Sequence, residues 1–280
     1  MDCRNSHLSP IGIFDSGYGG LTVLKEVIKL LPEYDYVYLG DNARNPYGTR
    51  SFDVVYDYTR EAVRRLIEMG CELVILACNT ASAKALRSIQ QNDLPRWGGN
   101  RRVLGVIRPS VESIADISVN KHVGILGTRG TVISESYLME AEKLYGNEHL
   151  HISQLACPML VPLVESNELT GEGTEYFVKK YIEQLFEKDG EIDTIVLACT
   201  HYPLLKDVIL KYTPIGVKVV EQGQIVAESL KDYLKRHPEM DRKLSKGSSV
   251  SYYTTEKAEL FDGMAGVFMG SGVEAKEIKI

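Results

Sequence analysis

The sequence contains no long apolar run. No segment approaches the roughly 18 consecutive apolar residues that a membrane-spanning helix needs. The first ten residues also lack the basic segment followed by an apolar segment that marks a secretory signal. We therefore expect a cytoplasmic protein that has no membrane partner.

An excess of basic residues is also missing. The chain has 32 Lys and Arg against 38 Asp and Glu, a formal net charge of −6. Proteins that bind nucleic acid neutralise phosphates with a basic surface, so we expect no nucleic-acid partner. The 280 residues, of which 44% are hydrophobic and 25% charged, suit a globular enzyme of one large or two modest domains.

The cysteines form no metal or disulfide pattern. The sequence has no C-x-x-C pair, which excludes zinc-ribbon and thioredoxin-type motifs. An odd number of widely spaced cysteines is not the framework of a small disulfide-rich protein. The five cysteines are Cys3, Cys71, Cys78, Cys157 and Cys199.

Short apolar segments alternate with helix-period segments along the chain. The apolar segments are mostly continuous and rich in Val, Ile and Leu, as strands buried on both faces are. This alternation predicts βαβ units and mainly parallel sheets covered by helices. The expected strands are Ile11–Phe14, Tyr36–Leu39, Leu73–Ala77, Val103–Val106, Val123–Leu126, Ile195–Ala198 and Val217–Val220. The expected helices are Val54–Met69, Ala81–Gln91, Thr174–Phe186 and Pro203–Tyr212.

Two segments of the first half recur in the second half. The segment ELVILACNT at 72–80 matches DTIVLACTH at 193–201, and IGIFDS at 11–16 matches VGILGT at 123–128. Both pairs occur in the same order and at similar separations, which indicates a duplicated α/β unit. The sequence therefore predicts two pseudo-equivalent, mainly parallel-sheet α/β domains.

The segment after Tyr212 leads into a strand and a helix that have no counterpart in a two-unit repeat. We expect these last elements to return to the first domain. The predicted domains are therefore residues 1–103 with 216–280, and residues 104–215. Asn92–Arg102 is the expected linker because it holds proline, two glycines and several charges.

Cys78 and Cys199 both stand where an expected strand ends and a helix begins. Ligands of doubly wound sheets bind beyond the carboxyl ends of the strands, and helix N-termini there attract carboxylates. The same partial positive charge lowers a cysteine pKa from about 8.5 toward neutrality. Thr80 and Ser82 are the expected caps of the first helix, and Pro203 suits the first turn of the second. Both positions therefore suit carboxylate binding and thiol activation.

The simpler role for a cysteine that follows a buried strand is that of a small core side chain without a chemical function. We assign that role to Cys71 and Cys157, and we place Cys3 in a disordered tail. Cys78 and Cys199 differ because they occupy matched positions and are followed by hydroxyl or amide groups. This combination favours a chemical role for the pair.

Two opposed thiols can invert a stereocentre. One thiolate removes a proton from a carbon acid and a thiol on the other face returns one, which is acid/base catalysis without PLP, flavin or metal. Asp15 and Ser16 end the first strand, and His201 follows Cys199 by two residues. These residues are candidates to orient the thiols or to share their protons. A capping aspartate and a surface histidine remain equal alternatives for Asp15 and His201.

Three further segments are weaker signals. Gly17–Gly20 is neither G-x-G-x-x-G nor a Walker A sequence, and we interpret it as a tight strand-to-helix turn. Gly40–Gly48 is either a surface loop or, because it follows a strand, a wall of a substrate site. Glu165 is either a solvated helix charge or a site carboxylate, and its spacing favours the solvated charge.

At these positions the chain resembles the glutamate racemase family, within the wider Asp/Glu racemase group. The resemblance runs from about Ile11 to Gly270, and its motifs are specific when taken together. They are IFDSGYGGL at 13–21, GDNARNPYG at 40–48, ACNTASA at 77–83, CPMLVPLVE at 157–165, LACTHYPLL at 197–205 and YYTT at 252–255.

The resemblance implies a cofactor-independent racemase with glutamate bound in the cleft between two α/β domains. By it, Cys78 deprotonates D-glutamate and Cys199 deprotonates L-glutamate, each returning the proton in the reverse direction. Asp15 would assist Cys78, and His201 would assist Cys199. It also implies a homodimer without a metal, whose D-glutamate serves bacterial peptidoglycan synthesis. The implied substrate-binding residues are Asp15, Ser16, Tyr47, Gly48, Asn79, Thr80, Thr200 and His201.

Two segments depart from the family pattern. One carries Arg108 where relatives often have another residue, and in the other Glu221-Gln222 replaces a version that contains aspartate. Neither departure falls on the catalytic pair. Both are candidates to alter cleft polarity or domain contacts.

Three other functions share parts of this pattern. A racemase of aspartate or another acidic amino acid would keep the two-thiol mechanism and differ only in its pocket. A related decarboxylase or isomerase would lack one cysteine. A binding or inhibitory protein of the same fold would have lost a cysteine, Asp15 or His201. The sequence retains all four residues, which favours the racemase, while the amino acid depends on the surrounding loops and on the resemblance.

Overall fold

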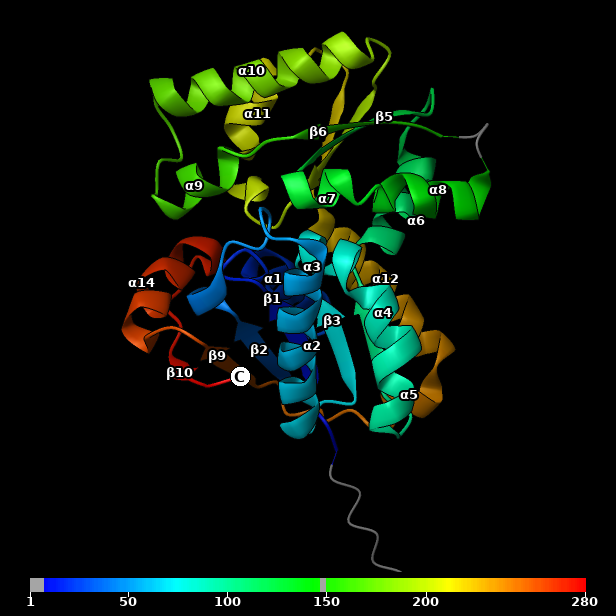
Figure 1. The fold of residues 1–280 in the computed structure, drawn as a ribbon, viewed down its shortest axis with the longest axis vertical. Helices are drawn as coiled ribbons and strands as arrows, with labels where there is room; N and C mark the ends of the chain where they lie inside the picture. Colours follow the sequence, from blue (N-terminus) through cyan, green and yellow to red (C-terminus); the bar gives the residue numbers. More distant parts are fainter. Residues whose placement is uncertain (1–7, 147–149) are drawn as a thin grey trace, which may run out of the picture.

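The computed structural model describes residues 8–146 and 150–280 as two parallel sheets with their covering helices (Figure 1). In spatial order, the first sheet holds β10 (Ala275–Glu277), β9 (Val250–Thr254), β2 (Tyr36–Gly40), β1 (Ile11–Asp15), β3 (Leu73–Leu76) and β4 (Arg102–Gly105). The second holds β6 (His151–Ala156), β5 (His122–Gly127), β7 (Thr194–Ala198) and β8 (Lys218–Val220). Every strand pair within the two sheets is parallel. The predicted α/β class with two mainly parallel sheets is confirmed.

Helices follow most of the strands. Those before the crossing to the second sheet are α1 (Leu21–Leu30), α2 (Phe52–Glu68), α3 (Asn79–Lys84), α4 (Leu86–Ser88) and α5 (Leu94–Trp97). The next group is α6 (Ile107–Ile117), α7 (Arg129–Ile133), α8 (Ser136–Tyr145), α9 (Leu160–Glu165), α10 (Glu172–Lys188) and α11 (Lys206–Tyr212). The last are α12 (Gln222–Arg236), α13 (Pro238–Asp241) and α14 (Ala258–Met269). Short 3₁₀ helices occur at Asn42–Arg44 and Tyr202–Leu205, and a π-helical turn at Ile89–Asp93.

Both faces of each sheet are covered, which explains the continuous apolar strands. In β1, Ile11 and Ile13 belong to the apolar cluster that contains α1, α12 and α14. Phe14 points to the opposite face and packs in the cluster that contains α2 and α3. The second sheet is covered in the same way, with α10 and α11 on the face of Ile195 and with α6 and α8 on the face of Val196. Side chains that alternate between two buried faces must all be apolar.

The two sheets repeat one strand order. The order β2-β1-β3-β4 in the first sheet corresponds to β6-β5-β7-β8 in the second. The matched sequence segments lie in β1 and β5, and in β3 and β7. The expectation that the strand at Val217–Val220 returns to the first domain is wrong, because β8 pairs with β7. Its place is that of β4, so this strand does have a counterpart in the repeat.

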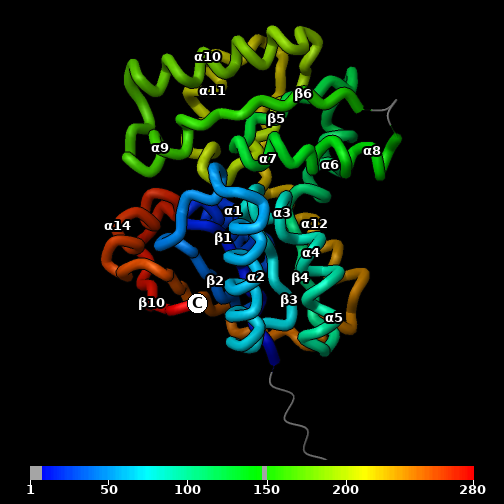
Figure 2. The backbone as a smooth tube through the Cα atoms, viewed as in Figure 1, coloured from blue at the N-terminus to red at the C-terminus, as the bar shows by residue number. Residues whose placement is uncertain are grey.

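The chain crosses between the sheets twice, and Figure 2 follows both crossings. The first crossing runs from β4 through α6 to β5, and the second from β8 into α12. Helix α12 packs on α1, so the helix, unlike β8, does return to the first sheet. The predicted linker at Asn92–Arg102 is wrong, because α5 and β4 belong to a crossover within the first sheet. The domain boundaries themselves stay predictions.

Three strands were missed because they lack the apolar signature of a central strand. Strands β6 and β10 are sheet edges, and β9 lies next to an edge. Their sequences, HISQLA, AKE and VSYYT, mix polar and apolar residues. Cys3 lies outside the described residues. Among the helices of the described residues, none is both long and apolar enough to cross a membrane.

The close packing of α10 on β5 gives a test of the fold. A Cβ at Gly124 in β5 would lie 2.6 Å from Leu185 Cδ2 and 3.2 Å from Ile192 Cδ1. We expect Gly124→Ala to lower the free energy of unfolding by about 1–3 kcal/mol, because a packed core resists added volume. The measurement is the midpoint of urea denaturation. The control Gly173→Ala, in α10, meets no heavy atom within 4 Å and should raise stability by about 0.4–1 kcal/mol. Equal effects of the two variants would contradict this packing.

Candidate active site

A cavity of about 120 Å³ lies where the carboxyl ends of the two sheets meet. Its walls come from segments that follow β1, β2 and β3 of the first sheet and β5, β6 and β7 of the second. This edge is where α/β proteins bind their ligands. Cys78 and Cys199 both line the cavity, one from each sheet. The structure therefore brings the predicted pair to one site.

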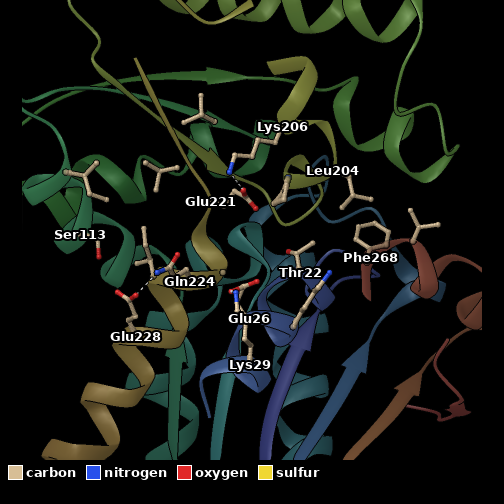
Figure 3. A pocket seen from close by; sticks show the side chains of 18 of the residues that line it. Thr22, Glu26, Lys29, Ser113, Leu204, Lys206, Glu221, Gln224, Glu228 and Phe268 are labelled. Atoms are coloured by element: carbon tan, nitrogen blue, oxygen red, sulfur yellow. Dashed lines mark hydrogen bonds and ion pairs between the residues drawn. The ribbon is translucent and has the colours of Figure 1, made fainter. Parts of the chain in front are cut away.

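A larger cleft of about 850 Å³ lies between α1, α6 and α12. Figure 3 shows that Lys206 and Glu221 face each other there, as do Gln224 and Glu228. None of the described residues that line this cleft is a cysteine or a histidine. The smaller cavity, which holds both, is therefore the candidate active site.

The smaller cavity collects all but one of the predicted site residues. Asp15 is the exception, since it lies fully buried at the end of β1 rather than in the wall. The predicted residues in the wall are Ser16, Tyr47, Gly48, Cys78, Asn79, Thr80, Cys199, Thr200 and His201. The loop at Gly40–Gly48 is thus a wall of the site.

Cys78 caps α3 with its own side chain. Its Sγ accepts a hydrogen bond from the Ala81 N–H at 3.4 Å, and its thiol donates to Ser16 Oγ at 3.5 Å. The expectation that Thr80 and Ser82 are the caps is therefore wrong. Ser82 instead donates to the Leu76 carbonyl at 2.9 Å, which fastens α3 to the end of β3.

Burial dominates the acidity of both thiols. It raises the pKa of Cys78 to about 11, and the Asp15 carboxylate adds to this rise. The hydrogen bonds of the Cys78 sulfur with Ser16 and with the Ala81 N–H oppose it. Burial also raises the pKa of Cys199 well above its usual value. The prediction that helix N-termini bring these pKa values toward neutrality is thus wrong. Loss of water around a buried thiolate outweighs the partial charge of a short helix.

His201 lies next to Cys199, and Glu165 is hydrogen-bonded to the far side of the His201 ring. His201 Nδ1 lies 4.0 Å from Cys199 Sγ, and His201 Nε2 lies 3.0 Å from Glu165 Oε1. The same Glu165 oxygen accepts a hydrogen bond from Asn45 Nδ2 at 2.6 Å. His201 is only 3% exposed, so the surface-histidine alternative is wrong. Glu165 is a site carboxylate rather than the solvated charge that its spacing favoured.

Asp15 connects the first sheet to the residue after Cys199. Its carboxylate accepts hydrogen bonds from the Gly17 N–H at 3.0 Å and from Thr200 Oγ1 at 3.3 Å. Burial raises its pKa, against the smaller opposing effect of His201. The Asp15 charge in turn raises the pKa of both thiols. The contact with Gly17 is a turn contact, and the contact with Thr200 reaches across to the second sheet.

The two halves touch closely around the cavity. A Cβ at Gly19 would lie 2.2 Å from Thr200 Oγ1 and 2.5 Å from His201 Nδ1, so only glycine fits there. The Gly130 N–H donates to the Gly48 carbonyl at 2.8 Å. Thr80 Oγ1 lies 2.8 Å from Thr128 Oγ1, which joins α3 to the loop after β5. These short contacts fix the distance between the opposed walls.

Sequence reasoning missed several wall residues outside the Gly40–Gly48 loop, which are Thr49, Thr128, Arg129, Pro158, Val161 and Pro162. One signal was present, because Thr128 matches Ser16 in the internal repeat. Cys157 and Cys71 are fully buried, as a core role requires, and burial raises the pKa of Cys71 to about 12. Cys157 nevertheless also borders the cavity. In the part of the chain that the structure describes, no group of three His, Cys, Asp or Glu side chains is arranged to hold a metal ion.

Neither departure from the family pattern lines the small cavity. Arg108 lies on α6 and forms ion pairs with Glu112 and Glu140. Glu221 pairs with Lys206, and Gln222 is buried among polar side chains. The ion pairs of Arg108 and Glu221 stay among elements that pack on the second sheet, whereas Gln222 also accepts a hydrogen bond from Asn79 in α3 of the first half. That these departures alter cleft polarity or domain contacts stays a prediction.

Burial predicts that the Cys78 thiol stays protonated near neutral pH. We expect its alkylation by iodoacetamide to accelerate about tenfold per pH unit from about pH 7 to about pH 9.5, because only the thiolate reacts. The rate should not level off, since the raised pKa lies above this range. Peptide mass spectrometry follows the modification, and Cys78→Ser identifies the signal. A plateau below about pH 8 would show that the helix field outweighs burial.

The sequence matches the Asp/Glu/Hydantoin racemase family over residues 19–230. It is 39% identical over 268 residues to a glutamate racemase of Aquifex aeolicus, an alignment that covers 95% of this chain and 96% of the relative. The structure is similar to that of glutamate racemase isoform RacE1 from Bacillus anthracis, with a TM-score of 0.87, 31% identity and coverage of 97% and 98%. It is also similar to a glutamate racemase from Francisella tularensis in complex with D-glutamate, with a TM-score of 0.85, 27% identity and 98% coverage of both chains. From this family match and these full-length similarities, the chain is an isomerase that belongs to the Asp/Glu/Hydantoin racemase family and groups there with the glutamate racemases.

Proposed function

We propose that this enzyme interconverts L-glutamate and D-glutamate by proton transfer between Cys78, the substrate and Cys199, without a cofactor. One observation carries the proposal: two cysteines from different sheets line one cavity. Their charges also interact, since a Cys78 thiolate raises the pKa of Cys199. The full-length similarity to glutamate racemases supports glutamate as the substrate.

The proposed step moves one proton off the α-carbon and another onto it. With D-glutamate, the Cys78 thiolate takes the α-proton, so the C–H bond breaks and an S–H bond forms. The Cys199 thiol then donates its proton to the opposite face of the carbanion and becomes the thiolate. L-glutamate reacts in the reverse direction, starting from the Cys199 thiolate. Such acid/base catalysis by positioned groups contributes about 10²–10⁴-fold in rate.

The ammonium group of the substrate compensates for the raised pKa values of the buried thiols. The ammonium group of glutamate brings a positive charge into the cavity, and a nearby positive charge favours a thiolate. His201 assists at Cys199, since a proton on Nε2 shared with Glu165 leaves Nδ1 to accept the thiol proton. Asp15 assists at Cys78. Its contact with Thr200 also holds the end of β1 against the segment that follows β7.

The cavity wall suits a small acidic amino acid. Arg129 is the one Lys or Arg among the described lining residues, and it is exposed at the cavity. A cationic side chain there complements a carboxylate. The proposed substrate contacts are the predicted residues that line the cavity, which are Ser16, Tyr47, Gly48, Asn79, Thr80, Thr200 and His201, whereas Asp15 is buried outside the wall. The family resemblance further supports a cytoplasmic homodimer whose D-glutamate supplies peptidoglycan synthesis.

The choice of glutamate is tested by substrate competition. We expect kcat/KM for L-glutamate to exceed that for L-aspartate by roughly 10- to 200-fold, the discrimination that one methylene group supports. Coupled assays of D-glutamate and D-aspartate measure both rates, with Cys78→Ser as the background control. Racemisation of aspartate alone would contradict the proposed substrate and leave the two-thiol mechanism in place.

The two-thiol mechanism is tested by replacing each cysteine. Cys78→Ser and Cys199→Ser should each lower racemisation in both directions by at least about 10²-fold, because a hydroxyl is a far weaker acid than a thiol. The control Cys71→Ala changes a buried thiol outside the cavity and should stay within about twofold. Circular dichroism followed over time measures the rates. Near-normal turnover by either serine variant would defeat the mechanism.

A further inference from the structure

Four buried polar side chains form one hydrogen-bonded network beside the active site. Gln222 Oε1 accepts from Asn79 Nδ2 at 2.6 Å, and Gln222 Nε2 donates to Ser110 Oγ at 2.6 Å and to Tyr137 Oη at 2.8 Å. The Tyr137 hydroxyl donates to Asn79 Oδ1 at 2.7 Å. All four residues are at most 4% exposed. A network whose buried members are all bonded holds its geometry firmly.

The network joins both crossings between the sheets. Ser110 lies in α6, which follows β4, and Gln222 is the first residue of α12, which follows β8. Figure 3 labels their neighbours Ser113, Glu221 and Gln224 at the edge of the larger cleft. Any change in the relative orientation of the two sheets must act through these two segments. The network is therefore placed to fix that orientation.

Asn79 connects the network to Cys78, one of the two proposed catalytic cysteines. Asn79 is the first residue of α3 and directly follows Cys78, whose Sγ accepts from the Ala81 N–H in the same turn. The side-chain nitrogen and oxygen of Asn79 are both bonded within the network. Asn79 thus acts as an anchor for the turn that presents the Cys78 thiol.

We propose that Gln222 is a positioning residue for Cys78: it holds Asn79, and with it the first turn of α3, in a fixed place relative to both crossings. The orientation of the two halves and the position of the Cys78 thiol are then set together. Gln222 itself does not line the cavity and touches no reacting atom. This inference rests on the proposed function only for the role of Cys78 in turnover.

The charges that act on Cys78 come from groups that share no side-chain hydrogen bond with Gln222 in the described part of the chain. The titratable groups whose charges interact with the Cys78 thiol are Asp15, Tyr38, Tyr47 and Cys199. None of them forms a side-chain hydrogen bond with Gln222 among the described residues. A change in the reactivity of Cys78 in a Gln222 variant therefore reports the position of α3.

Gln222→Met tests the proposal, because methionine has a similar length and forms none of these hydrogen bonds. We expect kcat for glutamate racemisation to fall about 10- to 100-fold, the cost of a misplaced catalytic group, with KM within about threefold. The alkylation rate of Cys78 should fall at least about fivefold at fixed pH, because the Ala81 N–H no longer supports the thiolate. The alkylation rate of Cys199 in the same sample should stay within about twofold of its rate in the unchanged protein.

Two further variants separate positioning from general destabilisation. Tyr137→Phe keeps the ring and removes the hydroxyl that contacts Asn79 and Gln222. It should lower the Cys78-to-Cys199 alkylation ratio, as Gln222→Met does. Thr59→Val removes a buried side-chain hydrogen bond to the Val55 carbonyl in α2, and it should leave the ratio and kcat unchanged. A ratio that is unchanged or raised in Gln222→Met overturns the proposal. The alkylation ratio needs no turnover, so it stands even if glutamate proves not to be the substrate.

Discussion

Parallel strands all end at the same edge of their sheet, so two parallel sheets can share one cavity only when these edges face each other. The close approach of Gly19 to Thr200 and His201, together with the hydrogen bond from Gly130 to Gly48, holds the edges in that position. Everything else at the site depends on this contact. It places a thiol on each side of one small space, and it excludes most of the water around both.

The exclusion of water sets the chemistry. Burial raises the pKa of both thiols and of Asp15, so the isolated site disfavours the thiolate form of either cysteine. In the proposed mechanism, the ammonium group of the amino-acid substrate changes this balance because a nearby positive charge favours a thiolate. The same dry surroundings strengthen the electrostatic contacts that acidify the α-carbon. In the proposed mechanism, reactivity therefore depends on the ammonium group that the substrate brings, rather than on a thiolate formed in advance by a helix terminus.

The sequence was sufficient to predict the fold class and the cavity residues nearest the strand ends, because buried strands and the repeated L-A-C segments leave a strong pattern. It was insufficient for β6 and β10, whose edge positions relax the demand for apolar residues. It also failed for Glu165, which reaches His201 and Asn45 only through the packing of α9 against distant loops. The thiol pKa values were predicted in the wrong direction, since helix position is local while burial is a property of the whole fold. Gln222 was noticed only as a departure, because its partners come from three separate segments.

The central claim is that two thiols act on opposite faces of one carbon, and isotope placement tests it directly. L-glutamate is incubated with the enzyme in D₂O, and both enantiomers are separated and analysed by mass spectrometry at low conversion. If Cys199 removes the proton and Cys78 delivers another, the D-glutamate formed carries solvent deuterium at the α-carbon while the remaining L-glutamate stays unlabelled. D-glutamate that retains the original proton would show that a single base acts on both faces, and it would contradict this account.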